Sequence, residues 1–252
     1  MRVAFLRSKV PTASSGGIGL VLFYGAMIYL FTHLVDGPIR YTLEVVGGEA
    51  LIYLRDVILI LMLGVVLGAA VKKGRINAVL LFFLVLLVLF SIVAVLYVRN
   101  IWQILFSLKI VLPFLAGLVC YRELFSDECR LTKYMGIFFF VALTGIYLNL
   151  FYRFPWTGLV YNFGDIQIEG GFDRFTSGFD RLQGFSRTNF EAATHVMLLV
   201  AYASVFFSSK WIRIILWIIA GCAIILTTTK GIIVVYILLS LFYIAYLMMP
   251  KL

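Results

Sequence analysis

Hydrophobic residues run along this chain in long segments that short polar stretches separate. A helix needs roughly 20 mostly apolar residues to cross the hydrocarbon core of a bilayer. Segment 77–98, for example, is 22 residues long by its bounds and contains no charged side chain. The pattern predicts about eight transmembrane helices, at residues 17–35, 50–71, 77–98, 101–121, 134–152, 192–208, 211–228 and 231–249.

These segments predict an all-α fold, a polytopic integral membrane helical bundle that forms a single membrane domain over residues 1–252. The composition agrees, because 63% of the 252 residues are hydrophobic and only 13% are charged. A soluble domain of this length would leave much of that apolar surface in water. The run from Ile18 to Leu34 follows a basic start and lacks a small-x-small cleavage site, so we expect an uncleaved first helix.

Lysine and arginine in the short loops predict the orientation of the bundle. With the N-terminus in the cytoplasm, every cytoplasmic loop is basic, and the one long loop, about residues 153–191, is extracytoplasmic. A loop of this length is usually functional or disordered, and its many aromatic residues argue against disorder. Gly64 and Gly68 form a GxxxG pair, which predicts close approach of another helix.

The net charge of +9 does not indicate nucleic acid, because the basic residues are scattered over short loops. The three cysteines match neither a disulfide framework nor a zinc site. With only two histidines in the chain, a histidine-rich metal centre is also not expected.

The long loop contains a cluster of arginines in the stretch GFDRFTSGFDRLQGFSRTNFEAA, residues 171–193. The guanidinium groups of Arg174, Arg181 and Arg187 offer forked donors that match phosphate oxygens in pairs. Asp173 and Asp180 each precede an arginine, so pairing within the loop is the alternative. Arg187 has no adjacent acid, which favours binding of a ligand.

Four further groups of polar residues are candidates. Lys109 lies within an apolar segment and should face the bundle interior, either as a functional charge or as a packing contact. Arg55 precedes Asp56 near the outer end of segment 50–71, where it pairs or reaches towards water. Lys230 follows three threonines at the start of a helix, a position that attracts anions. Glu191 and His195 share one helix face, as an acid/base pair or a local hydrogen bond.

The stretch RLQGFSRTNFEAA (181–193), followed one hairpin later by LTTTKG (226–231), resembles the signature of the O-antigen ligase and O-antigen polymerase superfamily. Arg181 and Gly184 match its Arg-x-x-Gly element, and Asn189 matches the last Asn of its Asn-Pro-Asn element. Lys230 and Gly231 match its Arg-Gly pair, with lysine in place of arginine. Members are typically longer and have a second large outer loop, so the resemblance implies a truncated or split member or a fragment.

The resemblance implies a metal-independent glycosyl transfer without a cofactor, at the outer face of the bacterial inner membrane. The donor is a glycan on a polyprenyl diphosphate, and the acceptor is a hydroxyl of a glycan or lipid. Residues expected to bind the diphosphate are Arg174, Arg181, Arg187, Asn189 and Lys230, and the candidates for the general base are Asp180 and Glu191.

Three questions stay open at the level of the sequence. The resemblance does not decide between a polymerase and a ligase. A transporter of an anionic or lipid-linked solute, with Lys109 as its intramembrane charge, is one alternative. A non-catalytic partner in a polysaccharide-export complex is the other.

Overall fold

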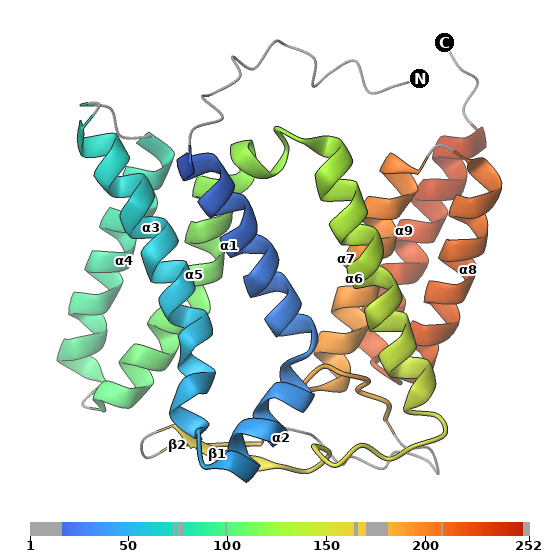
Figure 1. Ribbon diagram of the computed structural model, residues 1–252, viewed down its shortest axis with the longest axis horizontal. Coiled ribbons are helices and arrows are strands. Elements are labelled where there is room, and N and C mark those ends of the chain that lie inside the picture. Colours follow the sequence, from blue (N-terminus) through green and yellow to red (C-terminus); the bar gives the residue numbers. More distant parts are fainter. Residues whose placement is uncertain are drawn as a thin grey trace.

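The computed structural model of the protein describes residues 17–72, 74, 78–98, 100–163, 166–169, 181–207 and 209–248 and shows a bundle of helices (Figure 1). A helix occupies each of the eight segments that the hydrophobic pattern predicts. The elements are α1 (Gly17–Leu34), α2 (Asp36–Val46), the 3-10 helix η2 (Glu49–Tyr53), α3 (Leu54–Lys72), α4 (Ala78–Tyr97), α5 (Ile101–Leu124), α6 (Glu128–Leu148), β1 (Val160–Phe163), β2 (Ile166–Glu169), α7 (Asn189–Phe206), α8 (Lys210–Leu226) and α9 (Lys230–Met248).

Among the described residues, five helical segments are long and apolar enough to cross a membrane, by length and composition. They are Gly17–Leu34, Leu51–Lys72, Ala78–Tyr97, Ile101–Tyr121 and Glu128–Leu148. Helix α4 shows the consequence most clearly, since Leu80 is its one buried residue. In water such a helix would expose a large apolar surface at a high cost in free energy, whereas lipid chains solvate it well.

The long helices form two groups (Figure 1). Helices α1, α3, α4 and α5 pack together, α6 packs with α7 and α8, and α9 packs on α7 and α8. Residues without accessible surface where α7 meets α8, among them Ala193, Val196, Ala220 and Ala223, have small side chains that let the backbones approach closely. This packing fixes the start of α7 relative to the turn between α8 and α9.

Successive long helices run in opposite directions, so the connections alternate between the two ends of the bundle. Helix α2, the described parts of the segment between α6 and α7, and the α8–α9 turn share one end, which we call the loop end (Figure 1). The hairpin of β1 and β2 also lies there and pairs Val160 with Glu169 and Phe163 with Ile166. The site described below is built at this end.

The structure differs from the sequence prediction in two loops. The stretch after α1 forms the short helix α2, which ends where Gly47 takes a left-handed conformation (φ 72°). The long connection also contains the β1–β2 hairpin, which the hydrophobic pattern did not predict. Both elements are too short to give a membrane-length signal, because that signal depends on about 20 apolar residues.

The boundaries of the long loop are shifted relative to the predicted 153–191. Helix α6 ends at Leu148, and α7 already begins at Asn189. Thr188 caps α7, because its side-chain oxygen accepts a hydrogen bond from the backbone N–H of Glu191 at 3.2 Å. Thr188 and Glu191 have the Thr-x-x-Glu spacing of a capping box, which is the signal for this earlier start.

The GxxxG prediction is wrong for the part of the chain that the structure describes. Neither Gly64 nor Gly68 has a heavy atom within 4 Å of the position that a Cβ atom would take, so no described helix packs closely on them. Close helix approach occurs instead at Gly25, where a Cβ would lie 2.9 Å from the sulfur of Met62.

Candidate functional site

The first part of the site is the contact between the start of α7 and the α8–α9 turn. The side-chain Nδ2 of buried Asn189 donates to the carbonyl oxygen of Thr227 and to Oγ1 of Thr229, both at 3.1 Å. The turn is tight, and Thr228 adopts a positive φ of 54°, which is rare for a β-branched residue. Lys230 follows as the exposed first residue of α9. Asn189 thus joins the two elements of the signature.

The segment before α7 is held against the end of α6 by a close backbone approach. The side-chain oxygen of Asn149 accepts hydrogen bonds from the backbone N–H groups of Gln183 and Gly184, at 3.1 and 3.2 Å. Gly184 takes φ 59°, and a Cβ there would lie 2.9 Å from the backbone nitrogen of Ile146. Only glycine fits both conditions without strain. This glycine matches the family's Arg-x-x-Gly element.

Helix α2 docks on the same segment from the other side. The N–H of Gly37 donates to the carbonyl oxygen of Phe185 at 2.9 Å. The indole of Trp156 covers Gly37 so closely that a Cβ would lie 2.5 Å from it, and the indole nitrogen donates to the carbonyl oxygen of Gly184 at 3.2 Å. Phe154 stacks on Trp156 with ring centroids 4.4 Å apart. The loop aromatics therefore close the gap between α2 and α6.

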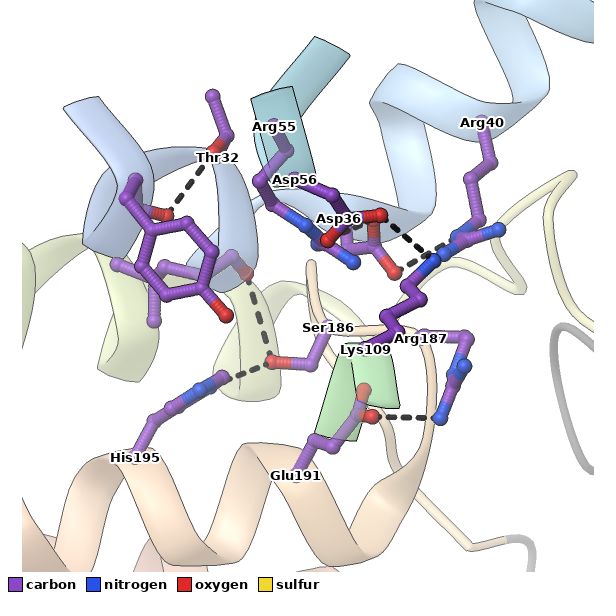
Figure 2. Close-up of polar contacts among 12 residues, drawn as sticks. Thr32, Asp36, Arg40, Arg55, Asp56, Lys109, Ser186, Arg187, Glu191 and His195 are labelled. Atoms are coloured by element: carbon purple, nitrogen blue, oxygen red, sulfur yellow. Dashed lines mark hydrogen bonds and ion pairs between the residues drawn. The ribbon is translucent and has the colours of Figure 1, made fainter. Parts of the chain in front are cut away.

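A group of ion pairs lies where α2 meets α3 (Figure 2). The carboxylate of Asp36 accepts from Nε of Arg40 at 2.7 Å and from Nη1 of Arg55 at 2.9 Å. Burial of Asp36 raises the pKa of its carboxyl, but the positive charges of Arg55 and Arg40 outweigh burial and hold this pKa below its ordinary value. Asp36 therefore stays charged and fixes both guanidinium groups in place.

Another ion pair joins α3 to α5. Nζ of Lys109 lies 2.9 Å from Oδ2 of Asp56 and 4.8 Å from the centre of the Tyr53 ring. Asp56 is in the first turn of α3, so this pair lies in the half of the bundle that is nearer the loop end. The sequence alone left open whether Lys109 marks a functional centre or a packing contact, and an ion pair with Asp56 is compatible with either role.

The fourth ion pair connects the loop to α7. Nη2 of Arg187 lies 2.7 Å from Oε1 of Glu191, four residues later, and both side chains are partly exposed. The second carboxylate oxygen of Glu191, Oε2, is buried and has no hydrogen-bond partner within the described part of the chain. A buried carboxylate oxygen gains free energy from a hydrogen-bond donor, so Oε2 can accept one from a bound molecule.

Next to Arg187 in the sequence, Ser186 connects the loop to the end of α1. Its Oγ lies 3.1 Å from Nδ1 of His195 and 3.4 Å from the carbonyl oxygen of Leu34 (Figure 2). The ring of His195 meets that of His33 edge to face, with centroids 5.1 Å apart. His195 therefore contacts Ser186 rather than Glu191, and the acid/base pairing that their spacing offered is not formed.

These pairs lie in one region rather than at scattered positions. Asp36, Arg55, Asp56 and Glu191 are all within electrostatic range of the Tyr29 phenol. Figure 2 shows Lys109 directed towards Asp56 and Arg187 directed towards Glu191. We call the residues of these four ion pairs the charge cluster: Asp36, Arg40, Arg55, Asp56, Lys109, Arg187 and Glu191.

The cluster contains some of the residues that the sequence singled out and adds others. Arg55, Lys109, Arg187 and Glu191 belong to it. Arg181 is half-buried in the segment before α7, while Arg174 and Asp180 lie outside the described residues. The additions are Asp36 and Arg40, whose signal was an acid and a base four residues apart.

The described residues hold no group of three or more His, Cys, Asp or Glu side chains that could bind a metal ion. Comparisons with protein-family models, with curated proteins and with solved structures found no match to this chain. The O-antigen ligase and polymerase resemblance therefore stays a prediction, and its weight depends on the geometry described above.

Proposed function

We propose that this protein is a metal-independent membrane glycosyltransferase of the O-antigen polymerase or ligase type. It transfers a glycan from a polyprenyl-diphosphate carrier to a hydroxyl of an acceptor glycan or lipid during assembly of a surface polysaccharide. The observation that carries this proposal is the pair of hydrogen bonds from Asn189 to Thr227 and Thr229. They bring the arginine-bearing and lysine-bearing elements of the resembled signature to one place.

In this reaction the diphosphate is the leaving group, so its negative charge grows as the glycosidic bond breaks. Cations that are already in position stabilise that charge, most strongly where water is scarce. Arg187 is held by Glu191, and Lys230 begins α9, whose N-terminal amides add positive potential. Arg181 lies six residues before Arg187 and, with Arg174, completes the set of diphosphate-binding cations that we propose.

The acceptor needs a base, and Glu191 fits that role. The acceptor oxygen bonds to the anomeric carbon while the bond from that carbon to the diphosphate oxygen breaks. The hydroxyl proton then moves to the Glu191 carboxylate, whose Oε2 has no hydrogen-bond donor among the described residues. Asp180, the other candidate from the sequence, stays a second candidate for the general base. Asn189 has both amide hydrogens engaged by the turn, so we assign it to positioning rather than to binding.

The proposal includes a topology. All eight long helices cross the inner (plasma) membrane of a bacterium, with the N-terminus in the cytoplasm and the loop end on the extracytoplasmic side. Two observations support it: five segments of the described chain have the length and composition of spans, and the charge cluster lies in the half of the bundle that is nearer the loop end. A lipid-linked diphosphate would be met at that end.

The test is transfer of a labelled glycan from a polyprenyl-diphosphate donor by the purified protein in vesicles. We expect Arg187→Ala and Glu191→Gln to lose transfer, because one weakens binding of the leaving group and the other removes the base. Arg130→Ala is the control, since Arg130 also pairs with a carboxylate, that of the N-cap Asp127 of α6, but more exposed and away from the loop end. Full transfer by both loop-end variants would overturn the proposal.

The Lys109–Asp56 pair favours a second candidate, transport of an anionic or lipid-linked solute. Ionisable residues within spanning helices often mark a solute pathway, and this pair bridges α3 and α5. If the protein is a transporter, the double variant Lys109→Met with Asp56→Leu abolishes solute uptake into vesicles. If it is a glycosyltransferase, the same double variant still transfers glycan.

A further inference from the structure

Helix α2 and η2 expose apolar side chains at the loop end. Val45 and Val46 are 69% and 76% exposed, and Leu51 and Leu54 are each 58% exposed. Thr42 lies on the same side of α2, one turn before Val45 and Val46, and its hydroxyl donates to the carbonyl oxygen of Pro38 at 2.8 Å. That hydroxyl is therefore satisfied by the backbone and does not need water. We call Val45, Val46, Leu51 and Leu54 the elbow patch.

The opposite side of α2 has the reverse character. Asp36 and Arg40 are buried there in the charge cluster, and Glu44 continues their four-residue spacing as an exposed acid. Gly37 also faces inward, against Trp156. A helix with an apolar outer side and a charged inner side is amphipathic, and such helices bind at the plane of a membrane surface.

The continuity of the elbow patch with α3 indicates what covers it. Leu51 and Leu54 begin an exposed stripe that continues at three- and four-residue spacing through Val57 (43% exposed) and Leu61 (63% exposed). This stripe belongs to the segment Leu51–Lys72, which is long and apolar enough to cross a membrane. The lipid that surrounds α3 would therefore also cover the patch.

We propose that α2 is an interfacial helix that lies in the headgroup layer of the leaflet at the loop end. The elbow patch enters the outer part of the hydrocarbon, and Asp36 and Arg40 face the bundle. This arrangement places the charge cluster at the depth of lipid phosphates. The inference does not require glycosyl transfer and applies to any function of the site.

The test compares two labelled positions on α2. Single cysteines, Val46→Cys on the patch and Glu44→Cys on the charged side, are introduced after Cys120→Ala, Cys129→Ser and Cys222→Ser. Each protein is reconstituted in lipid vesicles and labelled with an environment-sensitive fluorophore. Lipids brominated on the acyl chain close to the headgroup then serve as quenchers.

We expect the label at position 46 to emit at shorter wavelength and to be quenched, and the label at position 44 to behave as in water. Equal exposure of both labels to water would overturn the proposal, and so would equal quenching of both. Rapid disulfide crosslinking of Val46→Cys between two copies in dilute vesicles would also overturn it, because the patch would then be a protein interface.

Discussion

The substitution Gly184→Ala tests how the loop is held on the bundle. Gly184 has φ 59°, and an added Cβ would lie 2.9 Å from the backbone nitrogen of Ile146 and 3.0 Å from the carbonyl carbon of Gly145. Both neighbours are backbone atoms of α6, which cannot rotate away as the end of a side chain can. The alanine therefore has to displace the loop from the helix.

The expected loss of stability has two parts. The left-handed conformation costs alanine about 1–2 kcal/mol relative to glycine, and overpacking against backbone adds about 1–3 kcal/mol. The matched control is Gly158→Ala. Gly158 also has a positive φ, 85°, but no heavy atom lies within 4 Å of its Cβ position. Gly158→Ala should therefore be destabilised only by the cost of the left-handed conformation, about 1–2 kcal/mol.

Unfolding of the purified protein in detergent micelles, followed by tryptophan fluorescence, gives both values. Trp156 reports on this contact directly, because its indole donates to the Gly184 carbonyl. We expect Gly184→Ala to be destabilised by about 2–5 kcal/mol and to shift the emission of the folded state. Equal destabilisation by Gly184→Ala and Gly158→Ala would refute the close contact between the loop and α6.

Three further predictions concern the charge cluster. Asp36→Asn leaves buried Arg40 and partly buried Arg55 without this carboxylate and should cost about 3–5 kcal/mol in unfolding free energy. Asp127→Asn, at a pair with about 40% exposed side chains, should cost at most about 1 kcal/mol. Because the pKa of Asp36 is lowered in the folded state, the stability that its carboxylate contributes is complete above its unfolded-state pKa of about 4 and is lost as the pH falls further. The unfolding free energy should therefore fall less steeply with acidification for Asp36→Asn than for the wild type. Equal slopes would contradict this. Lys109→Met should destabilise the protein more than Lys109→Met combined with Asp56→Leu, as unfolding of both variants would show, because the single change leaves a buried carboxylate unpaired.

The sequence predicted the long helices well, because their signal is simple. A run of apolar residues such as 77–98 has few alternatives to a membrane-length helix, and α4 occupies it. The predicted boundaries were less accurate where a capping residue decides them. With Thr188 as its cap, α7 begins at Asn189, three residues before the predicted position 192. Helix α2 was missed because its apolar residues cover only one side and its length is 11 residues.

The candidate site could be predicted only in part, for a physical reason. A single charged residue within an apolar segment stands out because placing it in the membrane costs free energy, and this signal identified Lys109 and Arg55. Their partners depend on how distant helices pack. Arg55 pairs with Asp36, 19 residues away, and not with its neighbour Asp56, which pairs with Lys109 instead. No local pattern carries that information.

The most direct test of the central claim is binding of a radiolabelled polyprenyl diphosphate to the purified protein in lipid nanodiscs. We predict saturable binding that unphosphorylated polyprenol does not compete for. Arg187→Ala should weaken it about 10- to 100-fold, the equivalent of a charge-assisted hydrogen bond of about 1.5–3 kcal/mol, while Arg130→Ala should bind like the wild type. Equal affinity of the wild type and Arg187→Ala, or equal competition by polyprenol, would contradict the claim that the loop end binds a diphosphate.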